Sequence, residues 1–151
     1  MSAPQSRSPT IPAAATGRAA LPDPKWGRNA ARRFHRLVKL ESTATGLAGR
    51  SGVFVAWHAG VQPRWVYVGR TPDLARAMRD LVHNAEVAAF EARGGVFVTW
   101  SFVSDEFQDG VVLFLTDLLE PLVANRRVRR KGVTPMPVQP PASSARRRRH
   151  E

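Results

Sequence analysis

The pattern of apolar and polar positions predicts a β-hairpin near the middle of the chain, between residues 52 and 71. Two short stretches alternate with a period of two, which is typical of half-buried strands. Residues 60–63, which include glycine and proline, predict the turn between them. The alternating sets are Val53, Val55 and Trp57 against Phe54, Ala56 and His58, and then Trp65 and Tyr67 against Val66 and Val68.

A helix is predicted directly after this hairpin. Thr71 offers a hydroxyl for the N-cap, and Pro72 suits the first helical position, where a missing N–H costs nothing. Apolar residues then recur at i, i+3, i+4 and i+7, so that one stripe packs on the sheet. These residues are Leu74, Ala77, Met78 and Leu81.

A second helix and a third strand follow. Asn84 predicts the N-cap of a helical run that ends at Gly94 and Gly95. Residues 96–103 (VFVTWSFV) alternate as a strand, and residues 105–109 predict an acidic connection.

The stretch 111–124 begins with strand-like composition but keeps an apolar helical face, and we predict a helix. Pro121 lacks the N–H that a helix needs, so the helix should end near Glu120. Together these elements predict an α/β (α+β) domain over residues 51–125, with a small three-stranded antiparallel sheet flanked by helices.

The two ends of the chain differ from this middle part in composition. Residues 1–24 are rich in proline, alanine and serine and predict disorder, and residues 126–151 predict a basic, proline-rich disordered tail that includes Arg146–Arg149. Residues 25–40 predict a basic amphipathic helix, followed by a linker over 41–50.

The net charge of +11 is unevenly distributed along the chain. Residues 1–50 carry a balance of +7 and residues 126–151 a balance of +8, whereas residues 51–125 carry −4. Attraction to phosphate should therefore begin in the two basic arms, through release of counterions.

Composition also narrows the class of protein. A chain of 151 residues is long enough for one domain with a buried core, and the absence of cysteine excludes disulfides and thiolate metal sites. No apolar run reaches the length of a membrane span, and no signal-peptide pattern is visible. We expect a cytoplasmic location, with an organelle transit peptide in the first twenty residues as an alternative.

Two short motifs resemble those of the GIY-YIG family, a set of small α/β nucleases and DNA-repair modules. They are Gly52-Val53-Phe54 and Tyr67-Val68-Gly69, the second followed by Arg70-Thr71-Pro72-Asp73-Leu74. The resemblance implies a shallow site on the sheet, with a motif tyrosine, a helix arginine for the scissile phosphate and a glutamate that binds Mg²⁺ or Mn²⁺. On this basis the predicted catalytic residues are Tyr67, Arg70, Arg76 and Glu120, with Glu120 as the metal ligand.

Two positions depart from the family pattern. Phe54 replaces the first motif tyrosine and cannot donate, accept or carry a proton. An ungapped count from Tyr67 puts the family arginine at Ala77, and Arg76 should point about 100° away from it. We therefore predict a nucleic-acid-binding protein, most simply for DNA, with impaired metal-dependent nuclease activity.

The remaining candidates belong to the arms and to alternative functions. An active Mg²⁺-dependent endonuclease and a non-catalytic protein-interaction module are the two alternatives, and residues 25–40 could also contact an anionic membrane surface. His58 and His83 are spare proton-transfer candidates, and the tryptophans are expected in the core. The predicted nucleic-acid-binding residues are Arg28, Arg32, Arg33, Arg36, Arg126, Arg127, Arg129 and Arg130.

Overall fold

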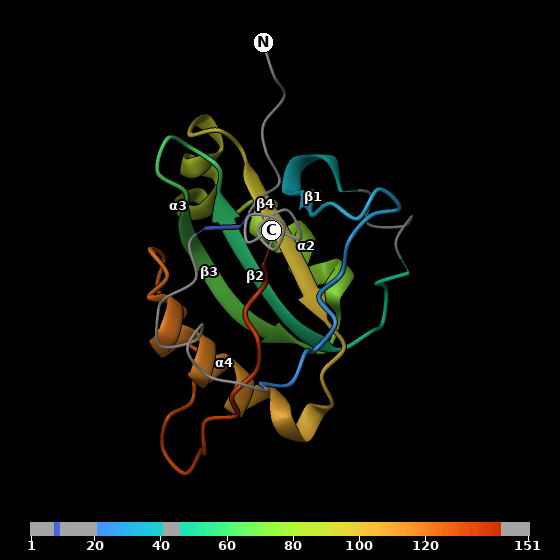
Figure 1. The fold of residues 1–151 in the computed structure, drawn as a ribbon, viewed down its shortest axis with the longest axis vertical. Coiled ribbons are helices and arrows are strands. Elements are labelled where there is room, and N and C mark those ends of the chain that lie inside the picture. The colour runs from blue at the N-terminus through green and yellow to red at the C-terminus, as the bar shows by residue number, and fades with distance from the viewer. Residues whose placement is uncertain (1–7, 10–20, 41–45, 143–151) are drawn as a thin grey trace, which may run out of the picture.

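The computed structural model describes residues 8–9, 21–40 and 46–142 and shows an antiparallel sheet of four strands with helices on both faces (Figure 1). The strand order is β1-β4-β2-β3, so β2 lies between the other two long strands. The α+β class is thus confirmed, and the sheet has one strand more than predicted. The elements are β1 (His35–Arg36), η1 (Leu37–Lys39), β2 (Gly52–His58), β3 (Arg64–Thr71), α2 (Leu74–Val82), α3 (Ala85–Ala88), η2 (Ala89–Ala92), β4 (Val96–Ser101) and α4 (Asp105–Leu119).

Both faces of the sheet are buried. All seven residues of β2 are buried, so the prediction of a half-buried strand is wrong. Val53, Val55 and Trp57 pack against α4, whereas Phe54 and Ala56 pack against α2 and α3. Successive residues of β2 therefore alternate between two buried, apolar faces. The sequence pattern alone predicts one buried face and one exposed face.

A β-bulge in the hairpin changes which face Tyr67 occupies. Ala56 pairs with Tyr67 while Trp57 pairs with Trp65, which leaves Val66 as the extra residue on β3. Trp65 and Val68 therefore pack on the α4 side, and Val66 and Tyr67 pack on the α2 side. Strict alternation of Trp65 and Tyr67 with Val66 and Val68 is thus wrong beyond the bulge.

Helix α2 begins two residues later than predicted. The carboxylate of Asp73 accepts hydrogen bonds from the backbone N–H groups of Ala75 and Arg76, so Asp73 is the N-cap. The Thr71 hydroxyl instead accepts from the Asp73 N–H. The apolar stripe is confirmed, and so is the cap of α3, where Asn84 accepts from Glu86 and Val87.

Residues 25–40 do not form the predicted amphipathic helix. The backbone N–H groups of Asn29 and Arg32 close a tight turn, and His35–Arg36 then pairs with β4 as β1. Trp26 and Phe34 are buried on the α4 face. Pairing with a distant strand and burial of two aromatic rings outweigh the local helical pattern here. Of the predicted linker, residues 41–45 lie outside the described residues.

Helix α4 includes residues 105–109, for which the sequence predicts an acidic connection. The helix begins at Asp105, where acidic residues favour the N-terminal turn, and ends at Leu119. The choice of helix over strand for this stretch is confirmed. Glu120 is the C-cap and has a left-handed backbone (φ 52°) in front of Pro121, and its N–H donates to the carbonyl of Thr116.

Residues 126–142 pack against the sheet domain rather than forming the predicted disordered tail. Val138 is buried, and the Trp26 indole donates to the carbonyl of Gln139 at 2.7 Å. The Met136 N–H donates to the carbonyl of Gly110, where an added Cβ would lie 2.6 Å from the carbonyl oxygen of Thr134. In Figure 1 this segment (red) runs beside residues 21–27 (blue). Residues 143–151, with Arg146–Arg149, lie outside the described residues.

No helix within residues 21–40 and 46–142 has the length and apolar character needed to cross a bilayer.

Candidate nucleic-acid interface

A hollow of about 810 Å³ lies between the end of β3, helix α2 and the chain that follows α4, and we call it the Tyr67 hollow. Its floor is apolar and its rim carries most of the charged groups. The lining residues that matter for its chemistry are Phe54, Tyr67, Arg70, Asp73, Arg76, Ala77, Asp80, Asn84, Asp109, Asn125, Arg126, Arg127 and Arg129.

Tyr67 enters this hollow because of the bulge in β3. Its ring stacks on Phe54 with centroids 5.9 Å apart. The tyrosine hydroxyl has no hydrogen-bond partner among the described residues. Burial raises the pKa of Tyr67, and the charge of Arg127 opposes that rise. Arg127 is thus close enough to act on the phenol electrostatically.

Gly69 has no side chain, and the rings of Phe54 and Tyr67 fill the space where its Cβ would lie. A Cβ at this position would lie 2.8 Å from Cζ of Phe54 and 3.1 Å from Cε2 of Tyr67. A ligand therefore does not reach the Gly69 backbone on this side, because the aromatic pair occupies that space.

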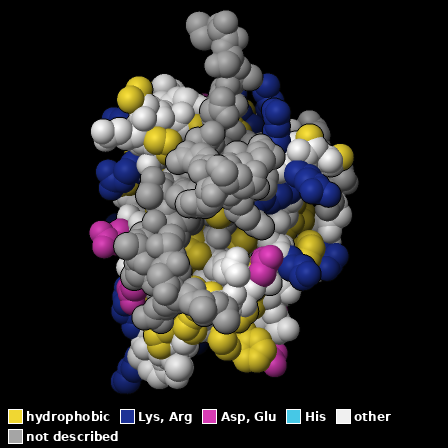
Figure 2. Space-filling model, viewed as in Figure 1, with side chains coloured by type: hydrophobic (Ala, Val, Ile, Leu, Met, Phe, Trp, Pro, Cys, Tyr) yellow, Lys and Arg dark blue, Asp and Glu magenta, His cyan; other side chains and the backbone are white. Residues whose placement is uncertain are grey.

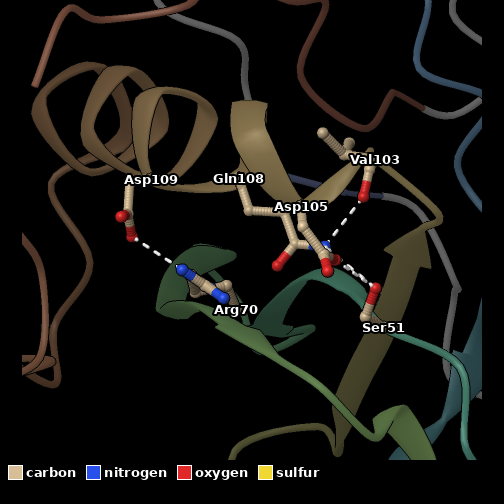
Figure 3. Close-up of polar contacts among 6 residues, drawn as sticks. All are labelled: Ser51, Arg70, Val103, Asp105, Gln108 and Asp109. Carbon is tan, nitrogen blue, oxygen red and sulfur yellow. Dashed lines mark hydrogen bonds and ion pairs between the residues drawn. The ribbon is translucent and has the colours of Figure 1, made fainter.

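The three predicted catalytic groups of the hairpin and first helix lie in one hollow. Arg70 forms an ion pair with Asp109 of α4 at 3.2 Å (Figure 3). Arg76 is exposed and lines the same hollow, so its rotation away from the stripe places it at the rim. Ala77 is buried and also lines the hollow.

Asp109 is the acidic residue that sequence reasoning missed. A buried glutamine fixes the helix turn that carries it: the side chain of Gln108 donates to the carbonyl of Val103 at 2.8 Å and lies within hydrogen-bond distance of Ser51 and Asp105 (Figure 3). This cluster joins the start of β2 to the start of α4. An isolated glutamine inside an otherwise apolar helix face was the available signal for it.

Asn125 brings the C-terminal arginines to the hollow. The backbone N–H groups of Leu122 and Val123 first donate to carbonyls of β3, so the chain runs along the free edge of that strand. The Asn125 side chain then donates to the carbonyl of Val68 at 2.9 Å and accepts from the Arg127 N–H at 2.9 Å. This turn places Arg126, Arg127 and Arg129 around the hollow. Asparagine directly before a basic run was the signal for such a turn.

Glu120 and Arg130 lie elsewhere. Both line a second, smaller hollow of about 390 Å³ on the other side of Asn125, where Arg130 forms an ion pair with Asp117 at 3.0 Å. Glu120 therefore does not fit as a metal ligand beside Tyr67.

Three carboxylates line the Tyr67 hollow, and they differ in the hydrogen bonds and ion pairs that they form. Asp73 caps α2 and Asp109 is paired with Arg70. Of these three, only the Asp80 carboxylate has neither a hydrogen bond nor an ion pair within the described residues. The described residues contain no group of three or more His, Asp or Glu side chains placed to hold a metal ion.

The N-terminal arginines take no part in this hollow. Arg28 donates to the carbonyls of Arg32 and Ala142 and lies over the ring of Phe34. Arg36 forms an ion pair with Glu91. Arg32 and Arg33 are exposed, but neither lines the hollow.

The two spare histidines also lie outside the hollow. His58 is buried, stacks on Phe90, and accepts a hydrogen bond from the Gly60 N–H. His83 is the C-cap of α2 and is exposed. Trp57, Trp65 and Trp100 are all buried, as predicted.

Comparison of the chain with protein-family models, with curated proteins and with solved structures finds no match. The resemblance to the GIY-YIG family rests on the two motifs and remains a prediction.

Proposed function

We propose that this protein binds nucleic acid through phosphate contacts in the Tyr67 hollow, without metal-dependent cleavage. The observation that carries the proposal is that Arg126, Arg127 and Arg129 line the hollow, are exposed, and have no carboxylate partner among the described residues. Guanidinium groups recognise phosphate oxygens through paired hydrogen bonds.

The position of these arginines changes the prediction from sequence. The arms and the acidic middle were expected to act separately, but residues 126–129 form part of the same concave surface as Tyr67 and Arg76. Lys and Arg side chains lie in separate groups along both margins of the face that Figure 2 shows. A concave site with several converging cations concentrates the attraction more than scattered charges do.

The positions of the carboxylates favour binding of nucleic acid over its cleavage. The resemblance implies a glutamate that holds a divalent cation near the tyrosine, whereas Glu120 lines the other hollow. Asp109 faces the hollow from α4 but is neutralised by Arg70. The remaining groups can position a phosphate chain, and binding is the chemistry they support.

The test compares two triple variants that remove the same charge. Arg126, Arg127 and Arg129 are changed to Gln in one, and exposed Arg32, Arg33 and Arg64, outside the hollow, in the other. Binding of a labelled oligonucleotide, single-stranded or duplex, is measured by anisotropy over a salt series. We expect the first variant to lose about tenfold or more in affinity and about 2 to 3 in the slope of log K against log salt. Equal losses in both variants would contradict the proposal.

A further inference from the structure

We infer that the ligand of the Tyr67 hollow is single-stranded nucleic acid, with one base stacked on Tyr67 and the flanking phosphates held by Arg126, Arg127 and Arg129. This inference rests on the phosphate-binding function proposed above and specifies its substrate. It depends on the size of the hollow, on the distribution of charge around it, and on its aromatic floor.

The size of the hollow suits a nucleotide rather than a double helix. Its volume of about 810 Å³ lies within the range of roughly 300–1,000 Å³ that holds compact organic ligands. A base inside a duplex is stacked and paired, so it enters such a hollow only after it leaves the helix, which costs a few kcal/mol. An unpaired strand does not carry that cost.

The charges around the hollow predict on which side the phosphates lie and on which side the base lies. Three arginines that form no ion pair with any described residue lie on the wall formed by residues 125–129. The α2 wall carries Asp73 and Asp80 beside Arg76, and the Arg70–Asp109 pair is neutral. Phosphates should therefore lie on the 125–129 wall, and the base should point toward β3 and α2.

The groups on that inner side suit a base. Tyr67 offers an aromatic ring backed by Phe54, and buried Ala77 and Leu81 add apolar surface. The Asp80 carboxylate, without a partner among the described residues, can accept from the amino or imino N–H groups of an unpaired base edge. Stacking on aromatic rings and an adjacent cationic wall are the two features of sites that bind single strands.

The experiment uses the full chain with one DNA strand, the RNA strand of the same sequence, and the DNA duplex. We expect both single strands to bind at least about tenfold more tightly than the duplex. Tyr67→Ala should weaken binding of single strands by roughly 5- to 150-fold, as expected for the loss of one stacked base. Tyr67→Phe should recover most of that loss. Phe107→Ala, at an exposed position outside the hollow, is the matched aromatic control. It should leave the affinity for single strands and for the duplex unchanged.

A second measurement does not depend on a variant that must fold. A single strand that carries 5-iodouracil is irradiated with the wild-type protein, and the crosslinked peptide is sequenced. Crosslinking to the peptide that contains Tyr67, the single tyrosine of the chain, supports the inference.

The outcomes separate this inference from the proposed function. Duplex binding that equals or exceeds single-strand binding, or crosslinks confined to other peptides, would overturn the inference. If the dependence on Arg126, Arg127 and Arg129 persists in that case, phosphate binding stands. A wild-type protein that binds none of the three probes overturns both.

Discussion

Two imidazoles stack on aromatic rings, and His58 is buried whereas His35 is half-buried. His35 stacks on Trp100 at 5.1 Å between ring centroids, and His58 stacks on Phe90 at 5.4 Å. Burial lowers the pKa of both side chains below the ordinary value of 6.5, and the charge of Arg93 adds to this effect at His58. Neither residue lines the Tyr67 hollow, so their titration bears on stability.

The pH dependence of stability follows from these two residues. The unfolded chain takes up protons on histidine near pH 6.5, while the folded imidazoles stay neutral to lower pH. The free energy of unfolding should therefore fall as pH decreases from about 7 to about 5. His58→Asn, which keeps an acceptor for the Gly60 N–H, should flatten this slope in urea titrations, with His83→Asn as the matched control for loss of an imidazole. A slope unchanged by His58→Asn would contradict the assignment.

At the scale of the element, the end of α4 decides where the following chain goes. The helix ends at Leu119, Glu120 is left-handed, and the chain then runs along β3 to Asn125. Glu120 combines a side chain with a backbone conformation that favours glycine. In this arrangement Glu120 is a helix-ending residue, and its carboxylate is not part of the Tyr67 hollow.

Glu120→Gly should therefore stabilise the protein. Relief of the left-handed strain outweighs the added flexibility of the unfolded chain, for a net gain of about 0.5–1 kcal/mol in the free energy of unfolding. Glu120→Ala is the control, since alanine keeps the strain and should give no such gain. Both variants should retain oligonucleotide affinity. A loss of binding in either variant would show that the Glu120 carboxylate belongs to the binding site.

At the scale of the whole molecule, the segments 21–34 and 136–142 complete the core of the described residues. Trp26 and Phe34 from the N-terminal side and Val138 from the C-terminal side belong to one apolar cluster on the α4 face of the sheet. The backbone N–H of Gln139 also donates to the carbonyl of Pro22 at 2.8 Å. The segment that supplies arginines to the hollow is thus anchored at its C-terminal end by Val138 and Gln139, and at its start by the Asn125 side chain on Val68.

Val138→Ala tests this anchoring. Val138 is only 6% exposed, and removal of two buried methyl groups should cost about 1–3 kcal/mol in the free energy of unfolding. Val61→Ala makes the same change at a residue that is 102% exposed and should cost almost nothing. Chemical denaturation of both variants gives the comparison. Equal stability would mean that residues 126–142 do not contribute to the core.

The sequence by itself determined the elements whose patterns are local. The three long strands, the apolar stripe of α2, the Asn84 cap and the end of α4 near Pro121 all agree with the structure within a few residues. Each depends on the spacing of neighbouring residues or on the chemistry of a single one, and these properties do not change with the rest of the fold.

Only the tertiary structure decided the parts that depend on distant residues. The bulge that turns Tyr67 toward α2 reflects pairing between β2 and β3, and β1 exists because residues 35–36 meet β4. The 126–142 segment is polar and rich in proline, so composition predicts disorder, yet its few apolar side chains find partners near Trp26 and α4. Composition averages over a segment, whereas burial depends on which individual side chains meet a surface formed elsewhere in the chain. For the same reason, three arginines assigned to a tail and an aspartate assigned to a connection lie around one tyrosine.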